Sequence, residues 1–294
     1  MAAAGAPVRV PVAVACRVLG LSTQGYYKWL KDPVCQRDWD DAHLIELLRE
    51  LHEDDATLGY RFLTDELLDE HGVTVGENRV HRLCRVAGIT ASHAKRRTSK
   101  AGSTGPAPHD DLLAVVDKHG VVHHEFTADR PNQVWLWDIS EHCTGEGKLY
   151  VCAIKDVFSN KIVGYSIDAR MKSSLARSAM RNAIALRSPV GTICHSDRGG
   201  QFRAKKTQRL LANNGLVGSM GRSYGAGDNA SMESFFALLQ KNVLDTRRWD
   251  TREELRLAIV TWIETKYNRR RRQRALGKLT PVEFETIYLA ADAA

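Results

Sequence analysis

Between residues 134 and 220 the chain alternates short apolar runs with amphipathic stretches, and this alternation restricts the possible folds more than any other feature. Three apolar runs come first: VWLWDISEH, KLYVCAIKDVF and KIVGYSID. Each has the length and the β-branched and aromatic content of a strand, and the turn SNK between the second and third runs predicts a hairpin. We therefore expect a sheet that begins with three consecutive strands.

Helices and strands then follow in alternation. Residues 173–187 place Leu175, Met180 and Ile184 on one side of a helix. GTICHSD predicts a fourth strand, residues from about 201 to 213 a second helix, and GLVGSM a fifth strand, after which a helix begins near Asp228 or Asn229. This is the element order of an RNase H-like core, an α/β fold in which a mixed five-stranded sheet is flanked by helices.

The first 90 residues have a different, all-helical pattern. Residues 8–31 predict a short helical element, and helices are expected over 41–53, 60–69 and 77–87, the last ended by Gly88. The third of these carries Arg79, Arg82 and Arg85, which is the outline of a helix-turn-helix DNA reader. A small helical bundle with a solvated basic face has the same pattern and stays open.

The composition between the two regions is that of a basic, flexible linker, with Lys95, Arg96 and Arg97 followed by Gly, Ser and Pro. We accordingly divide the chain into a helix-turn-helix-like region (1–90), a linker (91–130), an RNase H-like core (131–250) and a basic helical extension (251–294).

Charge and cysteine content narrow the possible functions only slightly. The net charge of +7, from 42 Lys and Arg against 35 Asp and Glu, suits a polyanionic partner but also fits many other proteins. None of the six cysteines forms a Cys-x-x-Cys pair, so no zinc ribbon or redox motif is indicated. No apolar run has the roughly 18 residues of a membrane span, and we expect a cytoplasmic protein, nucleoid-associated when bound to DNA.

Three acids fall where this element order would bring them together. Asp138 lies in the first strand, Asp197 ends the fourth, and Glu233 lies in the first turns of the last helix, with 35 residues between Asp197 and Glu233. Two Mg²⁺ ions can activate the attacking oxygen and stabilise the leaving oxygen of a phosphodiester, and a few carboxylates suffice to hold them. In this hypothesis Gly199 and Gly200 let the backbone turn away from the metal site.

Several neighbouring residues have two possible roles. Asp156, Asp168 and Asp228 are rival acids, and Asp228 also fits a helix cap. His195 precedes Asp197 by two and points to the same side of its strand, either as active-site support or as a packed structural histidine. Asn229 either caps the last helix or braces the active site.

Four stretches resemble, in order and spacing, the DDE transposases of bacterial insertion sequences, whose core is shared with retroviral integrases. They are PNQVWLWDIS, HSDRGGQF, GDNASMESFF and YNRRRRQRALGKLTPVEFE. The pattern is most similar to the OrfB-type catalytic subunit of the insertion-sequence-three family, and LGYRFLTDEL with ENRVHRLCRVAGI resembles the helical DNA-binding domain of that family. The resemblance covers roughly residues 20 to 288.

The resemblance implies a DDE triad of Asp138, Asp197 and Glu233, with Asp138 bridging two metal ions and the other two acids holding one each. The ions would be Mg²⁺, for which Mn²⁺ can substitute. The implied reaction is metal-dependent cleavage of DNA at the ends of the element, followed by transfer of the freed 3′-hydroxyl to another phosphodiester. The implied partners are the element ends, target DNA, an upstream-frame OrfA-type subunit or frameshift fusion, and further copies of the chain on DNA.

The resemblance also has one departure. Family members often carry a lysine seven residues after the glutamate, where this chain has Gln240, followed by Lys241. Regular helical spacing would put Gln240 on the face of Glu233, with Lys241 rotated by about 100°. Either residue could contact DNA. The arginine run Arg269, Arg270, Arg271 and Arg272 predicts further phosphate contacts.

Two other functions remain compatible with the sequence. An RNase H-type nuclease would use the same acids to hydrolyse DNA without strand transfer. A DNA-binding regulator derived from a mobile element would keep the fold without the reaction.

Overall fold

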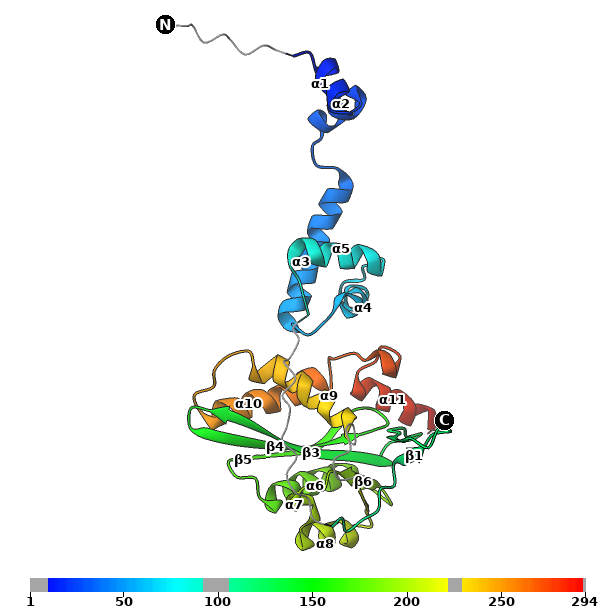
Figure 1. Cartoon of the computed structure of the whole chain (residues 1–294), viewed down its shortest axis with the longest axis vertical. Helices are drawn as coiled ribbons and strands as arrows, with labels where there is room; N and C mark the ends of the chain where they lie inside the picture. The colour runs from blue at the N-terminus through cyan, green and yellow to red at the C-terminus, as the bar shows by residue number, and fades with distance from the viewer. Residues whose placement is uncertain (1–9, 92–105, 222–228, 293–294) are drawn as a thin grey trace. The chain divides into compact units, whose positions relative to one another are not determined.

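The computed structural model describes residues 10–91, 106–221 and 229–292 and divides the chain into two compact units, Met1–Ala91 and Ser92–Ala294 (Figure 1). Lys95, Arg96, Arg97 and Asp228 lie outside the described residues. Among the described helices, none combines the length and the apolarity that crossing a membrane requires.

The first unit is helical, as predicted. Its helices are α1 (Val12–Val18), α2 (Thr23–Lys31), α3 (Gln36–Asp54), α4 (Tyr60–His71) and α5 (Glu77–Ala87). The last three pack around a leucine-rich core that includes Leu48, Leu63, Leu67, Val80 and Leu83. Helices α4 and α5 are joined by the short connection 72–76, and each ends at a glycine in the left-handed conformation, Gly72 and Gly88. The element expected over 8–31 is two helices rather than one.

The second unit contains a hairpin and a five-stranded sheet. The hairpin pairs β1 (Ala114–Val116) with β2 (Val122–His124). The sheet consists of β3 (Val134–Thr144), β4 (Gly147–Asp156), β5 (Ile162–Asp168), β6 (Ile193–Ser196) and β7 (Val217–Met220), in the order β5-β4-β3-β6-β7. Strands β3, β4 and β5 are antiparallel neighbours, whereas β6 and β7 run parallel to β3. The mixed sheet predicted from the element order is confirmed.

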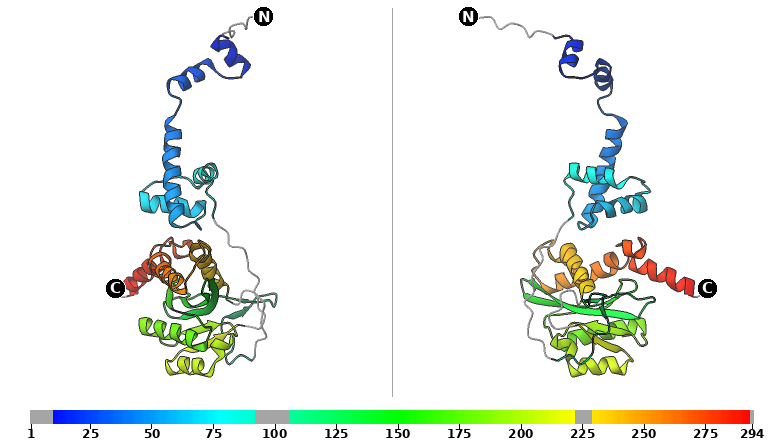
Figure 2. Two further views of the ribbon diagram at one scale, coloured as in Figure 1. Left: turned by 90° about the vertical axis from the view of Figure 1, so that its left-hand side faces the viewer. Right: turned by 45° about the vertical axis from the view of Figure 1, so that its right-hand side comes forward.

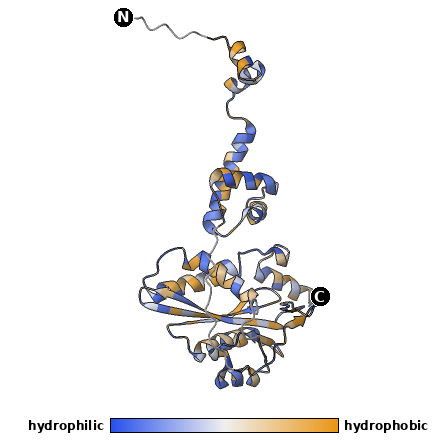
Figure 3. Cartoon of the chain, viewed as in Figure 1, coloured by the Kyte–Doolittle hydropathy of each residue, from blue (hydrophilic) through white to orange (hydrophobic). Residues whose placement is uncertain are grey.

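Both faces of the sheet are covered, which explains why its strands read as nearly continuous apolar runs. In β3, Val134 and Leu136 belong to one core and Trp135 and Trp137 to the other. The first core lies under α9 (Ala230–Leu239) and α10 (Arg252–Thr261), and the second under α6 (Ser173–Arg187), α7 (Gly200–Arg203) and α8 (Lys205–Asn213) (Figures 1 and 2). Figure 3 shows both hydrophobic and hydrophilic residues on these helices, as expected when one side of each is buried.

Helix α6 approaches β5 closely because Gly164 has no side chain. A Cβ atom at that position would lie 2.6 Å from the Ala183 Cβ and 2.7 Å from the Ala179 carbonyl oxygen. The predicted bounds of this helix, 173–187, are those of the structure.

Two predicted segments differ from the structure. The linker expected over 91–130 contains the β1–β2 hairpin, and its Leu113 is buried in the core under α9 and α10. The helix expected over 201–213 is two helices separated by Ala204, which is extended (φ −57°, ψ 131°). Thr207 and Gln208 explain the break, because their side chains donate hydrogen bonds to the carbonyl groups of Gln201 and Phe202.

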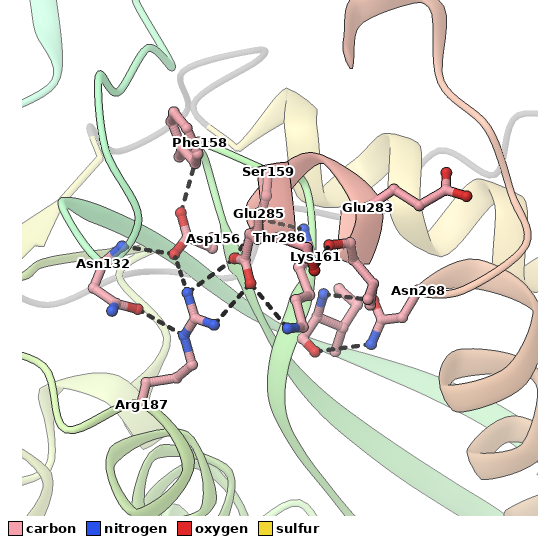
Figure 4. Close-up of polar contacts among 12 residues, drawn as sticks. Asn132, Asp156, Phe158, Ser159, Lys161, Arg187, Asn268, Glu283, Glu285 and Thr286 are labelled. Carbon is pink, nitrogen blue, oxygen red and sulfur yellow. Dashed lines mark hydrogen bonds and ion pairs between the residues drawn. The ribbon is translucent and has the colours of Figure 1, made fainter. Parts of the chain in front are cut away.

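The C-terminal segment continues from α10 through a π-helical turn, η2 (Trp262–Tyr267), and a short 3₁₀ turn, η3 (Arg274–Leu276), to α11 (Pro281–Asp292). Glu285 of α11 accepts hydrogen bonds from Ser159 (2.8 Å), Lys161 (2.9 Å) and both terminal nitrogens of Arg187 (2.8 and 2.9 Å) (Figure 4). Asn268 bonds both the N–H and the carbonyl oxygen of Ile162. These contacts fix the chain to the core on both sides of the arginine run.

Candidate active site

Strand register brings two of the three predicted acids together. Strands β3 and β6 run parallel, with Leu136 opposite His195. Asp138 lies two residues beyond this pair within β3 and projects from the same sheet face as Leu136, and Asp197 directly follows the last residue of β6. Neighbouring strands are about 4.8 Å apart. The negative charge of Asp197 raises the pKa of Asp138, so the two carboxylates lie close together near the end of β6.

Glu233 comes from α9 on that face. Met232, Phe235 and Leu239 are buried in the core below the helix, whereas Glu233 is exposed. The carboxylate of Glu233 is near enough to raise the pKa of Asp138 by charge repulsion. All three predicted acids are thus in one electrostatic neighbourhood.

Of the three acids, Asp138 has the pKa that is shifted most. Burial is the largest cause, followed by the negative charge of Asp197, and with Glu233 these raise its pKa to about 7. The N–H of Ile139, which donates to Oδ1 of Asp138 at 2.7 Å, opposes the increase. Without a cation, this carboxyl group therefore keeps its proton to a higher pH than an ordinary aspartic acid does.

Asp197 lies at the edge of the same group and is held by its own loop. Although the residue is exposed, partial removal of water from the carboxyl group raises its pKa, while a hydrogen bond from the Gly199 N–H to Oδ1 (2.9 Å) and the nearby His195 lower it. A Cβ atom at Gly199 would lie 2.9 Å from the same Oδ1, whereas one at Gly200 would meet nothing within 4 Å. Only the first of the two glycines is required by the space around Asp197.

Asn229 connects β3 with α9. Its side-chain Nδ2 donates to the carbonyl oxygen of Trp137 (3.3 Å), next to Asp138, and its own carbonyl oxygen accepts from the N–H of Glu233 (3.0 Å). Its side chain forms no cap hydrogen bond with the helix. Asn229 is thus the N-cap residue of α9, and its side chain contacts β3 next to Asp138 instead of the helix.

Lys155 is a second connection to α9, and sequence reasoning missed it. Its Nζ donates to the hydroxyl (2.8 Å) and the carbonyl oxygen (3.2 Å) of Ser231, in the first turn of the helix. Burial lowers its pKa to about 8. The only trace in the sequence is a lysine inside the apolar run KLYVCAIKDVF. A lysine is unusual in a strand whose two faces are both buried.

The rival acids have other surroundings. Asp156 is fully buried and accepts hydrogen bonds from the N–H groups of Asn132 (2.7 Å) and Phe158 (3.0 Å), and Arg187 lies 3.6 Å away (Figure 4). Asp168 is exposed at the end of β5, where it accepts from the N–H of Arg170 (3.0 Å). Asp156 thus belongs to the network that anchors α11.

His195 is fully buried and contacts Ser219, its neighbour on β7, through Nδ1 (2.9 Å). The rings of His124 and Phe126 pack against it, with centroid separations of 5.5 and 6.3 Å. Its ring thus packs against groups from β2 and β7 and lies on the same face as the three acids.

The predicted DNA contacts of α5 are partly engaged within the first unit. Arg79 and Arg82 both bind Asp41, at 2.8 and 2.5 Å, and the Arg82 hydrogen bond is the largest cause of the lowered pKa of that carboxyl group. Arg85 is exposed and, with His81, Arg82 and Val86, lines a shallow pocket on the outer side of the helix.

At the end of α9, the α-helical spacing stops at Leu239, and residues Gln240–Leu244 form a π-helical turn, η1. The expected division of faces between Gln240 and Lys241 rested on regular α-helical spacing. The Gln240 amide donates to Asp245 (2.5 Å). Which of the two residues contacts DNA stays a prediction.

In the arginine run, Arg269 and Arg270 are exposed, whereas Arg271 and Arg272 are half-buried. Arg272 lies 4.0 Å from Glu283 of α11.

The donor set of the three acids fits a divalent cation. Carboxylate oxygens are the ligands that Mg²⁺ and Mn²⁺ prefer. Burial and two negative neighbours raise the pKa of Asp138. The positive charge of a bound cation would favour the charged form of this carboxyl group and lower its pKa again.

Family comparisons agree with both units. A family described as "HTH-like domain" matches residues 38–97, and families described as "Integrase core domain" match residues 128–226 and 214–281.

Several curated relatives match nearly the whole chain. The chain is 34% identical to an insertion element IS600 31 kDa protein of Shigella sonnei, covering 93% of this chain and 98% of the relative. It is 32% identical to the transposase of IS629 from the same species (90% and 81%), and 31% identical to transposase InsF of IS3A from Escherichia coli K12 (94% and 94%). Among solved structures, the catalytic core of HTLV-2 integrase matches 54% of this chain and 99% of its own, with a TM-score of 0.43 and 20% identity.

Proposed function

Because the chain belongs to the insertion-sequence-three (IS3) family of bacterial transposases, we propose that Asp138, Asp197 and Glu233 are the residues with which it cuts and joins DNA. As a member of this family it is a DDE polynucleotidyl transferase that acts in DNA transposition and integration, and it combines an integrase core with an HTH-like domain.

One observation carries the assignment of the triad. The pKa of Asp138 is raised to about 7 by its burial and by the charges of Asp197 and Glu233, so Asp138 on β3 lies close to an acid at the end of β6 and to another on α9. Acids on strands and on a helix keep their spacing better than acids on a mobile loop, and that spacing matters for a metal-dependent phosphoryl transfer.

The integrase core family is metal-dependent, and two Mg²⁺ ions, replaceable by Mn²⁺, are the cofactors we propose. When bound, they activate the attacking oxygen and stabilise the leaving oxygen of the phosphodiester. Asp138, Asp197 and Glu233 would hold these ions. Since burial and the two neighbouring acids raise its pKa to about 7, Asp138 would have to give up its proton in order to hold a cation.

The supporting residues have positioning roles. The N–H of Gly199 orients Oδ1 of Asp197. Asn229 and Lys155 hold the first turn of α9, and therefore Glu233, against β3 and β4. In this proposal Gly199, Asn229 and Lys155 take no part in the chemical step itself.

For DNA binding we propose two regions. The outer side of α5 around Arg82 and Arg85 would contact the element ends, and the segment Arg269–Arg272 would contact phosphates near the core. An OrfA-type subunit, or a fusion with it, and further copies of the chain are the protein partners that the family suggests. The domain divisions at 91 and 251 are proposals of the same kind.

The experiment is a strand-transfer assay on labelled DNA that carries the ends of the element, with Mg²⁺ or Mn²⁺, using the chain alone and joined to its upstream frame. Metal-dependent 3′ nicking followed by joining to a second DNA is the expected result. Hydrolysis without joining would favour a nuclease, and binding without cleavage in either form would favour an inactive regulator.

A further inference from the structure

We propose that Asp111, His124 and His195 bind a transition-metal ion of the Zn²⁺ type, at a site separate from the three acids of the triad. One oxygen or nitrogen atom of each residue lies within 4.8 Å of the others. Asp111 precedes β1, His124 lies in β2 and His195 in β6, so the site would connect the hairpin to the strand that ends at Asp197.

The donor set is typical of zinc rather than of magnesium. Two imidazoles and one carboxylate are ligands that Zn²⁺ accepts in a three-ligand site, whereas Mg²⁺ prefers oxygen and retains several waters. The three side chains are largely withdrawn from solvent, with 12% of Asp111, 6% of His124 and none of His195 exposed. A carboxylate in such surroundings requires a compensating positive charge.

The distances leave a position between Asp111 and His195. Oδ2 of Asp111 is 2.7 Å from Nε2 of His124, which is a hydrogen-bond length, but Oδ1 of Asp111 is 3.9 Å from Nδ1 of His195. Two ligands that share a tetrahedral zinc ion are separated by roughly 3.3 Å. To share an ion, Asp111 and His124 would have to move apart, and the ligand atoms, which now lie within 4.8 Å of one another, would have to settle at this separation.

The surroundings already orient two of the three ligands. The N–H of Leu113 donates to Oδ1 of Asp111 (3.3 Å), and Ser219 contacts Nδ1 of His195 while accepting from the N–H of Leu112 (3.0 Å). On metal binding the Ser219 hydroxyl would release Nδ1. Phe126 stacks on His124 with an interplanar angle of 10° and supplies an apolar wall.

An ion at this site would connect β6 to the β1–β2 hairpin. His195 precedes Asp197 by two residues on β6, so an ion held by His195 would fix the strand end and the hairpin together. The role is structural positioning, and it does not depend on which acids catalyse the reaction.

The test compares tag-free wild-type chain with Asp111→Asn and His124→Gln, all in excess Mg²⁺ so that carboxylate-rich sites are filled. His123→Ala is the matched control, because His123 is the neighbour of His124 and is 45% exposed. We expect wild type and the control to retain about one more zinc per chain than the two variants. Zinc at about 100 times its dissociation constant should raise their Tm by about 5 °C, with no such increase in the variants.

A second measurement needs no variant and covers the case in which a substitution prevents folding. Co²⁺ added to wild type should give the intense visible absorption of a low-coordinate site with imidazole ligands, and one equivalent of Zn²⁺ should abolish it. Equal zinc content and equal Tm shifts in wild type and folded variants would overturn the proposal. So would a Co²⁺ spectrum of the weak, six-coordinate type, and the cluster would then be a hydrogen-bonded network only.

Discussion

The carboxyl group of Asp138 has two unfavourable surroundings at once, because it is buried and because Asp197 and Glu233 are negatively charged. A pKa raised above its unfolded value means that the folded chain binds a proton that the unfolded chain has lost between pH 3.8 and about 7. Stability from this group is therefore present below pH 3.8 and is lost as the pH rises through 7.

Replacing Asp138 with Asn should remove this loss. Without divalent metal, we expect Asp138→Asn to be more stable than wild type by about 1–3 kcal/mol at pH 8, and by less at pH 5. Urea unfolding at the two pH values measures both differences. A stability difference that is the same at pH 5 and pH 8 would show that the folded chain does not disfavour the charged form of Asp138.

Gly199 makes a second prediction at this scale. Since a Cβ atom there would lie 2.9 Å from Oδ1 of Asp197, Gly199→Ala should displace that carboxylate and reduce strand transfer by about 10- to 100-fold. Gly200→Ala is the control, because its Cβ meets nothing within 4 Å. Equal activity of the two variants would mean that the position of Asp197 is not critical.

Besides its buried apolar side, helix α9 is held by two polar side chains from outside the helix, Asn229 before it and Lys155 of β4. The pKa of Lys155 is lowered to about 8, so between pH 8 and the ordinary value of 10.5 the unfolded chain binds a proton that the folded chain does not. Stability due to this group consequently rises with pH across that window, and below pH 8 its burial is a constant cost.

Lys155→Met should abolish this dependence while keeping most of the apolar stem. The stability of wild type relative to the variant should increase by about 2 kcal/mol between pH 8 and pH 10, because other titrating groups cancel in the comparison. Unfolding curves of both proteins at the two pH values provide the measurement. A difference that does not change with pH would mean that Lys155 keeps its ordinary proton affinity.

Elements with a strong apolar period could be predicted from the sequence, and the others could not. Residues 173–187 repeat apolar side chains at helical spacing, and the helix has those bounds. The β1–β2 hairpin was missed because its strands are three residues long and lie in a polar stretch that reads as a linker. The π-helical turns at 240–244 and 262–267 continue apolar patterns that also fit an α-helix.

The candidate site was predictable to the same limited extent. Asp138, Asp197 and Glu233 could be proposed because each falls at the end of, or early in, an element with a clear pattern. Lys155, Asp111 and His124 could not, because their partners are set by strand order and by the hairpin. Contacts between such distant segments leave no periodic pattern in the sequence.

At the scale of the whole molecule, the basic C-terminal segment is held at two points. Asn268 binds the start of β5, and Glu285 binds Ser159, Lys161 and Arg187. Burial by itself would raise the pKa of Glu285, but the hydrogen bonds from Arg187 and Lys161 outweigh it and lower the pKa. These two contacts hold in place the segment that carries the exposed Arg269 and Arg270.

If this segment contacts phosphates, Arg269→Ala with Arg270→Ala should weaken DNA binding without regard to sequence. The slope of log K against log salt concentration should become shallower by about 1 to 2. Arg181→Ala is the control, since this exposed arginine lies on α6, at the opposite face of the sheet from α9. An unchanged slope in the double variant would assign the run to the solvated surface.

The central claim is that Asp138, Asp197 and Glu233 together carry out strand transfer, and one assay tests it most directly. Asp138→Asn, Asp197→Asn and Glu233→Gln keep the side-chain shapes but remove the charges, and Asp168→Asn is the matched control because Asp168 is an exposed acid at the end of β5. With Mg²⁺ and DNA carrying the element ends, joining should fall to background in the three variants and persist in the control. Joining that survives in any of the three folded variants would contradict the account.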